Sequence, residues 1–330
     1  MKNIRLCFVI LLGLTIVPIT ACGNGHSGET YMLISNNIKV PYWQIAAGGW
    51  LQSANQLKVG YEFTGPATYD PASEKTALEY AIQKRPAGIL VSVADANLLG
   101  DVINRGIAEG IPIVTVDSDA PSSKRLFFIG TNNYAAGVAG GKRLAQELKG
   151  HGTVAVFTMP SQPNLQERLH GYRDALESSP GIKLAEIKDI KGDSRVAFDT
   201  TTQILANDKK EHIDAFVCLE ALSCKEVATV LSNNSITGRP VIGMDTDPET
   251  LDWIKKGVIV ATIAQKPFTM AFVGLKMLDN LHHQQLQTLD RDWAHDGFAP
   301  VPAFVDTGSA IVDKSNVESF ESATKSLTGK

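Results

Sequence analysis

The sequence predicts an α/β protein built from two doubly wound, parallel-sheet lobes. From Thr30 onward, short β-rich runs alternate with helical patterns, which is the signature of this class. Runs such as Ile113–Val116 are almost continuously apolar, as parallel strands covered on both faces usually are. The alternation continues too long for one ordinary open sheet. Two lobes of about 100–150 residues each fit usual domain sizes better.

The chain is expected to begin with an export signal and a tether. Lys2 and Arg5 precede an apolar run over residues 6–17, which is short for a membrane span and typical of a secretory signal peptide. The run leads to Ile19-Thr20-Ala21-Cys22, which resembles a bacterial lipobox. We therefore expect a lipoprotein signal peptide over residues 1–21, lipidation of Cys22 and a glycine-rich tether over residues 22–29. The alternative is an ordinary signal peptide with an incidental cysteine.

The folded part is expected to open with strand and helix units in alternation. Strands are predicted over residues 31–35, 59–63, 89–93 and 113–116. Helices are predicted after Pro41, after Pro71 and around Leu99. In the third helix, apolar residues recur three and four positions apart after Leu99, which indicates a face packed against a sheet.

The alternation starts again after about Tyr134. A Gly/Ala-rich helix to Leu148 is followed by further helices over residues 165–176, 196–206, 225–231 and 249–256. The strands predicted between and after them cover residues 154–157, 184–187, 215–218, 241–244 and 258–263. Neither half repeats the sequence of the other.

Composition and charge exclude several classes. The 330 residues are 44% hydrophobic and 20% charged, so the chain can bury large cores. Its net charge is −4, and removing Lys2 and Arg5 with a signal peptide leaves the folded part more acidic still. A nucleic-acid surface that neutralises many phosphates is therefore not expected.

The cysteines fit an exported protein. Cys7 lies in the signal peptide and Cys22 in the lipobox, so only Cys218 and Cys224 remain in the folded part. In an export compartment these two could form a disulfide or remain as thiols.

Motifs for catalysis and metal binding are missing from the sequence. Gly141-Lys142 lacks the rest of a phosphate-binding loop, and the H-E-x-x-H, C-x-x-C and G-x-S-x-G patterns do not occur. The segment 303–309 resembles an aspartic-protease loop around Asp306, but that chemistry needs two such carboxylates and only one copy is present. We expect a strand that ends in a tight turn there, no enzyme activity, no cofactor and no metal.

Polar and aromatic side chains follow the predicted strands. They include Asn36 and Asn37, Tyr42 and Trp43, Asp117, Gln162 and Asn164, Arg168, Glu220, Asp245 and Gln265. In an open α/β sheet, ligands bind beyond the carboxyl ends of the strands. Aromatic rings can cover the apolar face of a sugar, while carboxylate, amide and guanidinium groups bind its hydroxyls. The pattern therefore predicts a sugar site.

The chain resembles the periplasmic sugar-binding proteins of the ribose-binding type, which have the type-1 periplasmic binding fold of ABC importers. The resemblance begins at Thr30 and is carried by five motifs together, which are Pro41-Tyr42-Trp43, residues 115–119, residues 164–172, Gly243-Met244-Asp245 and residues 261–265. It implies two lobes joined by a three-stranded hinge. It places residues 30–131 and 266–293 in the N-lobe and residues 132–265 and 294–330 in the C-lobe.

The resemblance also implies roles for single residues. Its stacking aromatic pair corresponds to Tyr42 and Trp43, its N-lobe carboxylate to Asp117 and its helix arginine to Arg168. A polar residue found in some members corresponds to Asn164, and the last two ligand-binding groups correspond to Asp245 and Gln265.

Three positions depart from the ribose-binding pattern. Ser118 stands where those members have an arginine, and Glu220 stands where they have an asparagine. An aromatic residue that closes the ribose site corresponds to Asp193. These differences point to a small polyhydroxylated ligand other than ribose. Glu220 is expected either to turn toward solvent or Lys225, or to face a ligand rich in hydrogen-bond donors.

Two functions follow from this resemblance. The first is an extracytoplasmic, lipid-anchored receptor that captures a monosaccharide or similar polyol and delivers it to an ABC permease. The second is a sugar or quorum-signal receptor that presents its ligand to a membrane chemoreceptor or sensor kinase. A repressor of related fold is disfavoured, because an export signal occupies the position of its DNA-binding helices.

Overall fold

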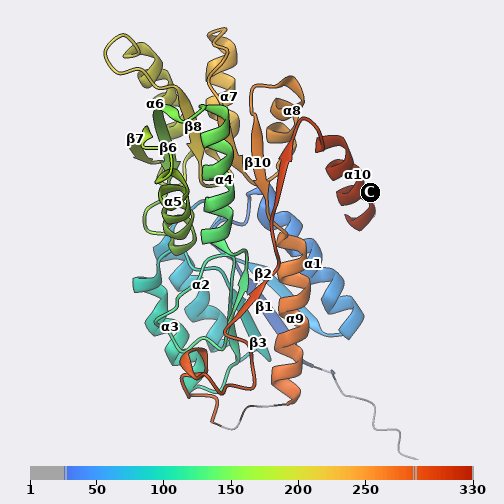
Figure 1. Cartoon of the computed structure of the whole chain (residues 1–330). Coiled ribbons are helices and arrows are strands. Elements are labelled where there is room, and N and C mark those ends of the chain that lie inside the picture. Colours follow the sequence, from blue (N-terminus) through green and yellow to red (C-terminus); the bar gives the residue numbers. More distant parts are fainter. Residues whose placement is uncertain (1–25, 27, 285, 287, 329–330) are drawn as a thin grey trace, which may run out of the picture.

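The computed structural model describes residues 26, 28–284, 286 and 288–328, which form two lobes stacked end to end (Figure 1). Each lobe contains a six-stranded sheet with helices on both faces, so the predicted fold class is confirmed. The predicted signal peptide and Cys22 lie outside the described residues. Within the described part of the chain, no helix is both long and apolar enough to cross a membrane.

The N-lobe sheet is parallel throughout. Its strands lie in the order β11 (Phe304–Asp306), β5 (Phe128–Gly130), β4 (Ile113–Val116), β3 (Gly88–Val91), β1 (Thr30–Ile34) and β2 (Gly60–Thr64). Helices α1 (Pro41–Leu57) and α9 (Pro267–His283) pack together on one face, and α2 (Pro71–Gln83) and α3 (Ala96–Ala108) cover the other. The four inner strands β5, β4, β3 and β1 are almost entirely buried because helices cover both faces, whereas the edge strands β2 and β11 are partly exposed.

The C-lobe sheet has the same order of strands, with one antiparallel edge. Its strands are β12 (Ala310–Asp313), β10 (Ala261–Ala264), β9 (Val241–Met244), β8 (Ala215–Cys218), β6 (His151–Thr158) and β7 (Gly181–Asp189). Strand β12 runs antiparallel to β10. Its helices are α4 (Asn133–Glu147), α5 (Pro163–Leu176), α6 (Ser194–Ala206), α7 (Ser223–Asn233), α8 (Pro248–Lys256) and α10 (Val317–Thr328).

Three chain crossings join the lobes, between β5 and α4, between β10 and α9, and between β11 and β12. The third crossing corrects the predicted boundary at residue 293. Strand β11 pairs with β5 of the N-lobe, and Ala299, Val301 and Val305 pack against the N-lobe core. The C-lobe therefore resumes only at β12. The short 3-10 helix Trp293–His295 also belongs to the N-lobe, because Trp293 is part of that core.

The Asp306 loop is the turn of this third crossing. The Asp306 carboxylate accepts hydrogen bonds from the backbone N–H groups of Gly308 (2.8 Å) and Asn132 (3.3 Å). Gly308 has a φ of 77°, in the left-handed region that favours glycine. The carboxylate thus shapes a tight turn, as the sequence predicts.

Two other predicted elements differ in the structure. The strand predicted over residues 258–263 begins only at Ala261, because the N–H groups of Val258 and Ile259 bond to the Trp253 carbonyl and close the end of α8. The tether predicted over residues 22–29 is wrong for His26 and Glu29, whose side chains contact α9.

Cys218 and Cys224 are both buried and free in the structure, so they are present as two thiols and not as a disulfide.

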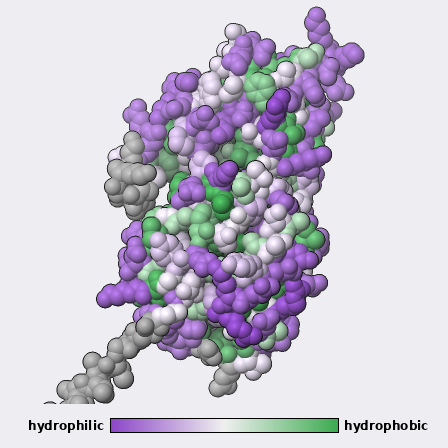
Figure 2. Space-filling view, turned by 180° about the vertical axis from the view of Figure 1, so that it is seen from behind, coloured by the Kyte–Doolittle hydropathy of each residue, from purple (hydrophilic) through white to green (hydrophobic). Residues whose placement is uncertain are grey.

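The face drawn in Figure 2 is mostly polar. Figure 2 shows hydrophilic residues over both lobes on the face drawn, with several hydrophobic residues at the waist between them. The waist is where the carboxyl ends of the parallel strands from both sheets meet.

Candidate functional site

A cavity of about 490 Å³ lies at the waist, between the carboxyl ends of the two sheets. Eight of the nine predicted ligand-binding residues line it, namely Tyr42, Trp43, Asp117, Asn164, Arg168, Glu220, Asp245 and Gln265. Each of these side chains is at least nine-tenths buried. These residues come from both lobes and lie beyond the carboxyl ends of the strands, where ligands bind in open α/β sheets.

The aromatic pair comes from the first turn of α1, which begins at Pro41. The two rings are nearly perpendicular, with centroids 5.2 Å apart. The Tyr42 hydroxyl donates a hydrogen bond to Asp117 Oδ1 (2.7 Å), and the Trp43 indole N–H donates to Asn36 Oδ1 (3.0 Å). Both rings are thus held in fixed orientations at the wall of the cavity.

Asp117 and Asp245 occupy matching positions in the two lobes. Asp117 follows β4 and Asp245 follows β9, and both adopt left-handed backbone conformations with φ of 64° and 68°. Each backbone N–H bonds to the neighbouring strand, at Ile129 and Ile263 respectively. Aspartate tolerates this conformation better than most residues. The bend at the end of each strand turns both carboxyl groups into the cavity.

Arg168 is the buried cation of the site, on α5. Its guanidinium donates to Asn133 Oδ1 (2.8 Å), the Leu219 carbonyl (2.7 Å) and Gln265 Oε1 (3.0 Å). Gln265 in turn donates to Asp245 Oδ1 (2.8 Å). The group therefore links α4, the end of β8 and the end of β10.

Close packing of α5 against α4 sets the position of Arg168. A Cβ atom on Gly137 would lie 2.1 Å from the Arg168 carbonyl oxygen, and one on Gly171 would lie 2.2 Å from the Tyr134 carbonyl oxygen. Only glycine allows backbones to approach this closely. The glycines of the Gly/Ala-rich helix α4 thus let α5 pack closely enough to place Arg168 at the cavity.

The structure excludes one of the two alternatives that the sequence left open for Glu220. It neither faces solvent nor contacts Lys225, which pairs with Glu249 at 3.0 Å. Its carboxylate accepts hydrogen bonds from the backbone N–H groups of Leu222 (2.5 Å) and Ser223 (3.3 Å), and from the Ser223 hydroxyl. Glu220 therefore holds the first turn of α7 while lining the cavity.

Asp193 does not line the cavity, and its predicted place there is wrong. It is exposed at the start of α6, where its side chain accepts a hydrogen bond from the Arg195 N–H (2.8 Å). The aromatic residue in this region is Tyr69, from the other lobe. A Cβ atom on Gly192, the neighbour of Asp193, would lie 2.3 Å from Tyr69 Cβ.

Tyr69 was missed by the sequence interpretation. It lines the cavity from the loop between β2 and α2, and its hydroxyl bridges the Ala94 carbonyl (3.0 Å) and Ser161 Oγ of the C-lobe (2.9 Å). The strand predicted over residues 59–63 ends shortly before it, so the strand-end rule also applies to Tyr69. Asn36, Asn37 and Gln162 line the cavity as well, and the same rule identifies them.

Three carboxyl groups face one guanidinium in this cavity. Burial raises the pKa of Asp245 to about 7, with the charges of Asp117 and Glu220 adding to the shift and Arg168 opposing it. Burial likewise raises the pKa of Asp117 and of Glu220, again against Arg168. The site is rich in hydrogen-bond acceptors, so it suits a ligand that brings donors and disfavours an anion.

The fold and this site define a class: a binding protein whose two hinged lobes enclose a small polar ligand. The chain belongs to the periplasmic binding protein domain family, which it matches over residues 31–285. Its relatives are solute-binding proteins, and this protein is accordingly a binding protein and not an enzyme.

Individual relatives are similar over most of their length. The D-allose-binding periplasmic protein of Escherichia coli (strain K12) is 24% identical over 275 residues, which are 80% of this chain and 88% of that protein. The crystal structure of a sugar-binding protein of a sugar ABC transporter from Bacillus halodurans is 37% identical, with a TM-score of 0.75, and the match covers 88% of this chain and 99% of that one. The arabinose-binding protein AraP from Geobacillus stearothermophilus is 32% identical, with a TM-score of 0.72 and coverage of 88% and 99%.

Proposed function

We propose that this protein is an extracytoplasmic solute-binding lipoprotein that captures a neutral monosaccharide or similar polyol and delivers it to an ABC importer. The observation that carries the proposal is the convergence of aromatic rings, carboxyl groups and a guanidinium on one buried cavity between the lobes. The cavity is lined by side chains of both lobes, as expected of a site that closes around a small ligand. The relatives named for allose and arabinose support a sugar as the ligand.

The charges that line the cavity restrict the kinds of ligand that we expect to bind. Sugar hydroxyls can donate to Asp117 and Asp245 and accept from Arg168, so a neutral sugar or one bearing an amine suits the cavity. A phosphate or carboxylate on the ligand would face three carboxyl groups with one guanidinium to balance them. Sugar phosphates and sugar acids are therefore expected to bind poorly.

A thermal-shift panel of pentoses, hexoses, polyols, amino sugars and sugar phosphates tests the proposal. A cognate sugar at 100 times its Kd is expected to stabilise the protein by about 2.7 kcal/mol. Asp117→Asn, which tolerates the same backbone conformation, should lose most of this shift. Asp193→Ala serves as the control, because Asp193 lies outside the cavity and should leave the shift intact. The proposal is wrong if no carbohydrate or polyol raises the melting temperature.

Membrane attachment through Cys22 is the second part of the proposal. Its support is the lipobox-like sequence that ends at Cys22 and the extracytoplasmic family to which the chain belongs. Cys22→Ser should be released from the membrane fraction in a soluble form, since the acyl chains supply the membrane affinity. A Cys22→Ser protein that still sediments with membranes as the unsubstituted protein does would contradict lipidation.

Delivery to a permease is tested in cells. Deleting the gene is expected to abolish uptake of the radiolabelled ligand at concentrations near its Kd, and a plasmid copy should restore it. Unchanged uptake together with a lost transcriptional or chemotactic response to the sugar would contradict delivery and favour the receptor that signals to a membrane sensor.

A further inference from the structure

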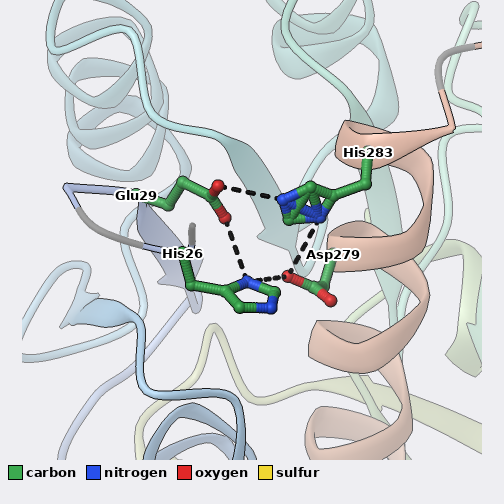
Figure 3. A group of neighbouring side chains, drawn as sticks. All are labelled: His26, Glu29, Asp279 and His283. Carbon is green, nitrogen blue, oxygen red and sulfur yellow. Dashed lines mark hydrogen bonds and ion pairs between the residues drawn. The ribbon is translucent and has the colours of Figure 1, made fainter. Parts of the chain in front are cut away.

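A cluster of two histidines and two carboxylates lies at the far end of the N-lobe from the cavity. His26 and Glu29 come from the segment that precedes β1, and Asp279 and His283 lie one turn apart on α9 (Figure 3). One potential ligand atom from each of the four residues lies within 4.8 Å of the others. In the sequence the two pairs are separated by almost the whole folded chain, so no local motif reveals the cluster.

The spacing of the four side chains matches that of ligands around one small metal ion. Glu29 lies 2.9 Å from His283 Nε2 and 3.4 Å from His26 Nδ1. Asp279 Oδ1 lies 3.2 Å from His26 Nδ1 and 3.8 Å from His283 Nδ1. Tetrahedral ligands bound to Zn²⁺ at about 2.0–2.2 Å are separated by about 3.4 Å. Small adjustments of side-chain rotamers would thus bring all four onto one ion.

The carboxylates of this cluster lack a permanent cation. The side chains of Glu29 and Asp279 are only 13% and 10% exposed, and within the described residues their ion-pair partners are His26 and His283 alone. Neither partner is a lysine or arginine, whose side chain would carry a permanent positive charge. A divalent cation would neutralise both.

Two further observations point to a ligand. The Nδ1 atom of His26 is shielded from solvent and faces both carboxylates, but among the described residues it has no partner placed for a hydrogen bond; the His26 side chain as a whole is 22% exposed. The hydroxyl of the fully buried Tyr31 lies 3.3 Å from Glu29 Oε2 and 3.3 Å from Asp279 Oδ1, where it can orient either carboxylate. Donors of this kind commonly support metal-binding carboxylates.

We propose that His26, Glu29, Asp279 and His283 bind one divalent transition-metal ion, with Zn²⁺ the best match to two imidazoles and two carboxylates. The ion joins the start of the folded chain to the end of α9 and so fixes the point at which the N-terminal segment leaves the N-lobe. The cavity lies beyond the opposite ends of the strands, so sugar binding does not depend on this ion.

Zinc titration of the untagged chain from residue 23 onward tests this site. Protein treated with EDTA and dialysed is titrated with Zn²⁺ in competition with a chromophoric chelator. We expect one equivalent to bind and to raise the melting temperature. His26→Ala and His283→Ala should each weaken binding at least about 100-fold, and Tyr31→Phe about tenfold, as loss of a supporting hydrogen bond does elsewhere.

His212→Ala is the matched control. His212 also contacts two carboxylates, Asp208 and Asp214, but without a second histidine, and its replacement should leave Zn²⁺ binding unchanged. Circular dichroism establishes that each variant is folded. The proposal is overturned if Zn²⁺ does not bind stoichiometrically below about 10 μM, a free energy of about 7 kcal/mol, or if His26→Ala and His283→Ala bind it as the unsubstituted chain does. A chain that binds zinc but no sugar would instead contradict the proposed function alone.

Discussion

Replacing Asp245 with asparagine measures how much the buried, ionised carboxylate of Asp245 lowers the free energy of unfolding. Asp245 Oδ1 accepts a hydrogen bond from Gln265 Nε2, and asparagine keeps that acceptor while removing the titrating proton. Asparagine also tolerates the left-handed backbone that Asp245 adopts. The Asp245→Asn protein therefore resembles the form in which this carboxyl group is protonated.

The sign of the effect follows from the raised pKa. Burial moves the pKa of Asp245 from 3.8 to about 7, so between these pH values the folded protein holds a proton that the unfolded chain releases. The free energy of unfolding then falls as the pH rises through this window. The stabilising contribution is complete below pH 3.8 and lost above pH 7. About three pKa units correspond to at most about 4 kcal/mol.

Urea unfolding of ligand-free protein at pH 5, 6, 7 and 8 measures this difference. Asp245→Asn is expected to gain stability over the unsubstituted protein progressively as the pH rises, reaching a few kcal/mol at pH 8. Asp313→Asn is the control, because the Ser315 and Arg143 hydrogen bonds lower the pKa of Asp313 to about 2 and its contribution is constant from pH 5 to 8. A difference between Asp245→Asn and the unsubstituted protein that does not change with pH, or that changes in the opposite direction, would refute the reasoning.

Three other substitutions test separate parts of the site. Arg168→Ala should weaken sugar binding by about 2 kcal/mol or more, because hydrogen bonds to a buried charged group are strong. Arg173→Ala, on the exposed face of α5, is the control and should bind sugar normally. Equal affinities of the two variants would mean that Arg168 has only a structural role. Glu220→Gln should lower the free energy of unfolding by about 1 kcal/mol, because an amide replaces the carboxylate that accepts hydrogen bonds from backbone N–H groups at the start of α7. An unchanged free energy of unfolding in urea would contradict this capping role. Tyr69→Phe should weaken sugar binding about fivefold, with little change in the free energy of unfolding, because it removes one hydrogen bond between the lobes. If calorimetry gives the same Kd for Tyr69→Phe and the unsubstituted protein, Tyr69 has no role in closing the lobes.

The sequence predicted the parts of the fold that depend on local patterns. Continuous apolar runs such as Ile113–Val116 indicated the buried parallel strands, and the helices predicted after Pro41 and Pro71 begin at those prolines. It predicted neither β5 and α9 nor the pairing of β11 with β5, which places the lobe boundary near residue 306. Strands β5 and β11 are three residues long, and only their pairing with each other and with β4 makes them strands. Such pairing is a tertiary contact that no short window contains.

The site shows the same division. The strand-end rule found Asp117 and Asp245, because both directly follow apolar strands. Asp193 was assigned from the family resemblance and lies outside the cavity, and Tyr69 was not among the predicted residues, because it lies five residues beyond the end of β2 at Thr64. The hydrogen-bond partners of Glu220 depend on how α7 starts, and the contacts of His26 with α9 depend on the packing of the whole N-lobe. Neither follows from residue type.

Isothermal titration of the soluble chain with the sugar ranked first in the thermal-shift panel tests the central claim most directly. The account predicts one site per chain, a neutral monosaccharide or polyol as the tightest ligand, and a Kd near 1 μM, which corresponds to about 8 kcal/mol. Failure of every neutral sugar to bind below about 1 mM, a free energy of about 4 kcal/mol, or a sugar phosphate as the tightest ligand, would contradict it.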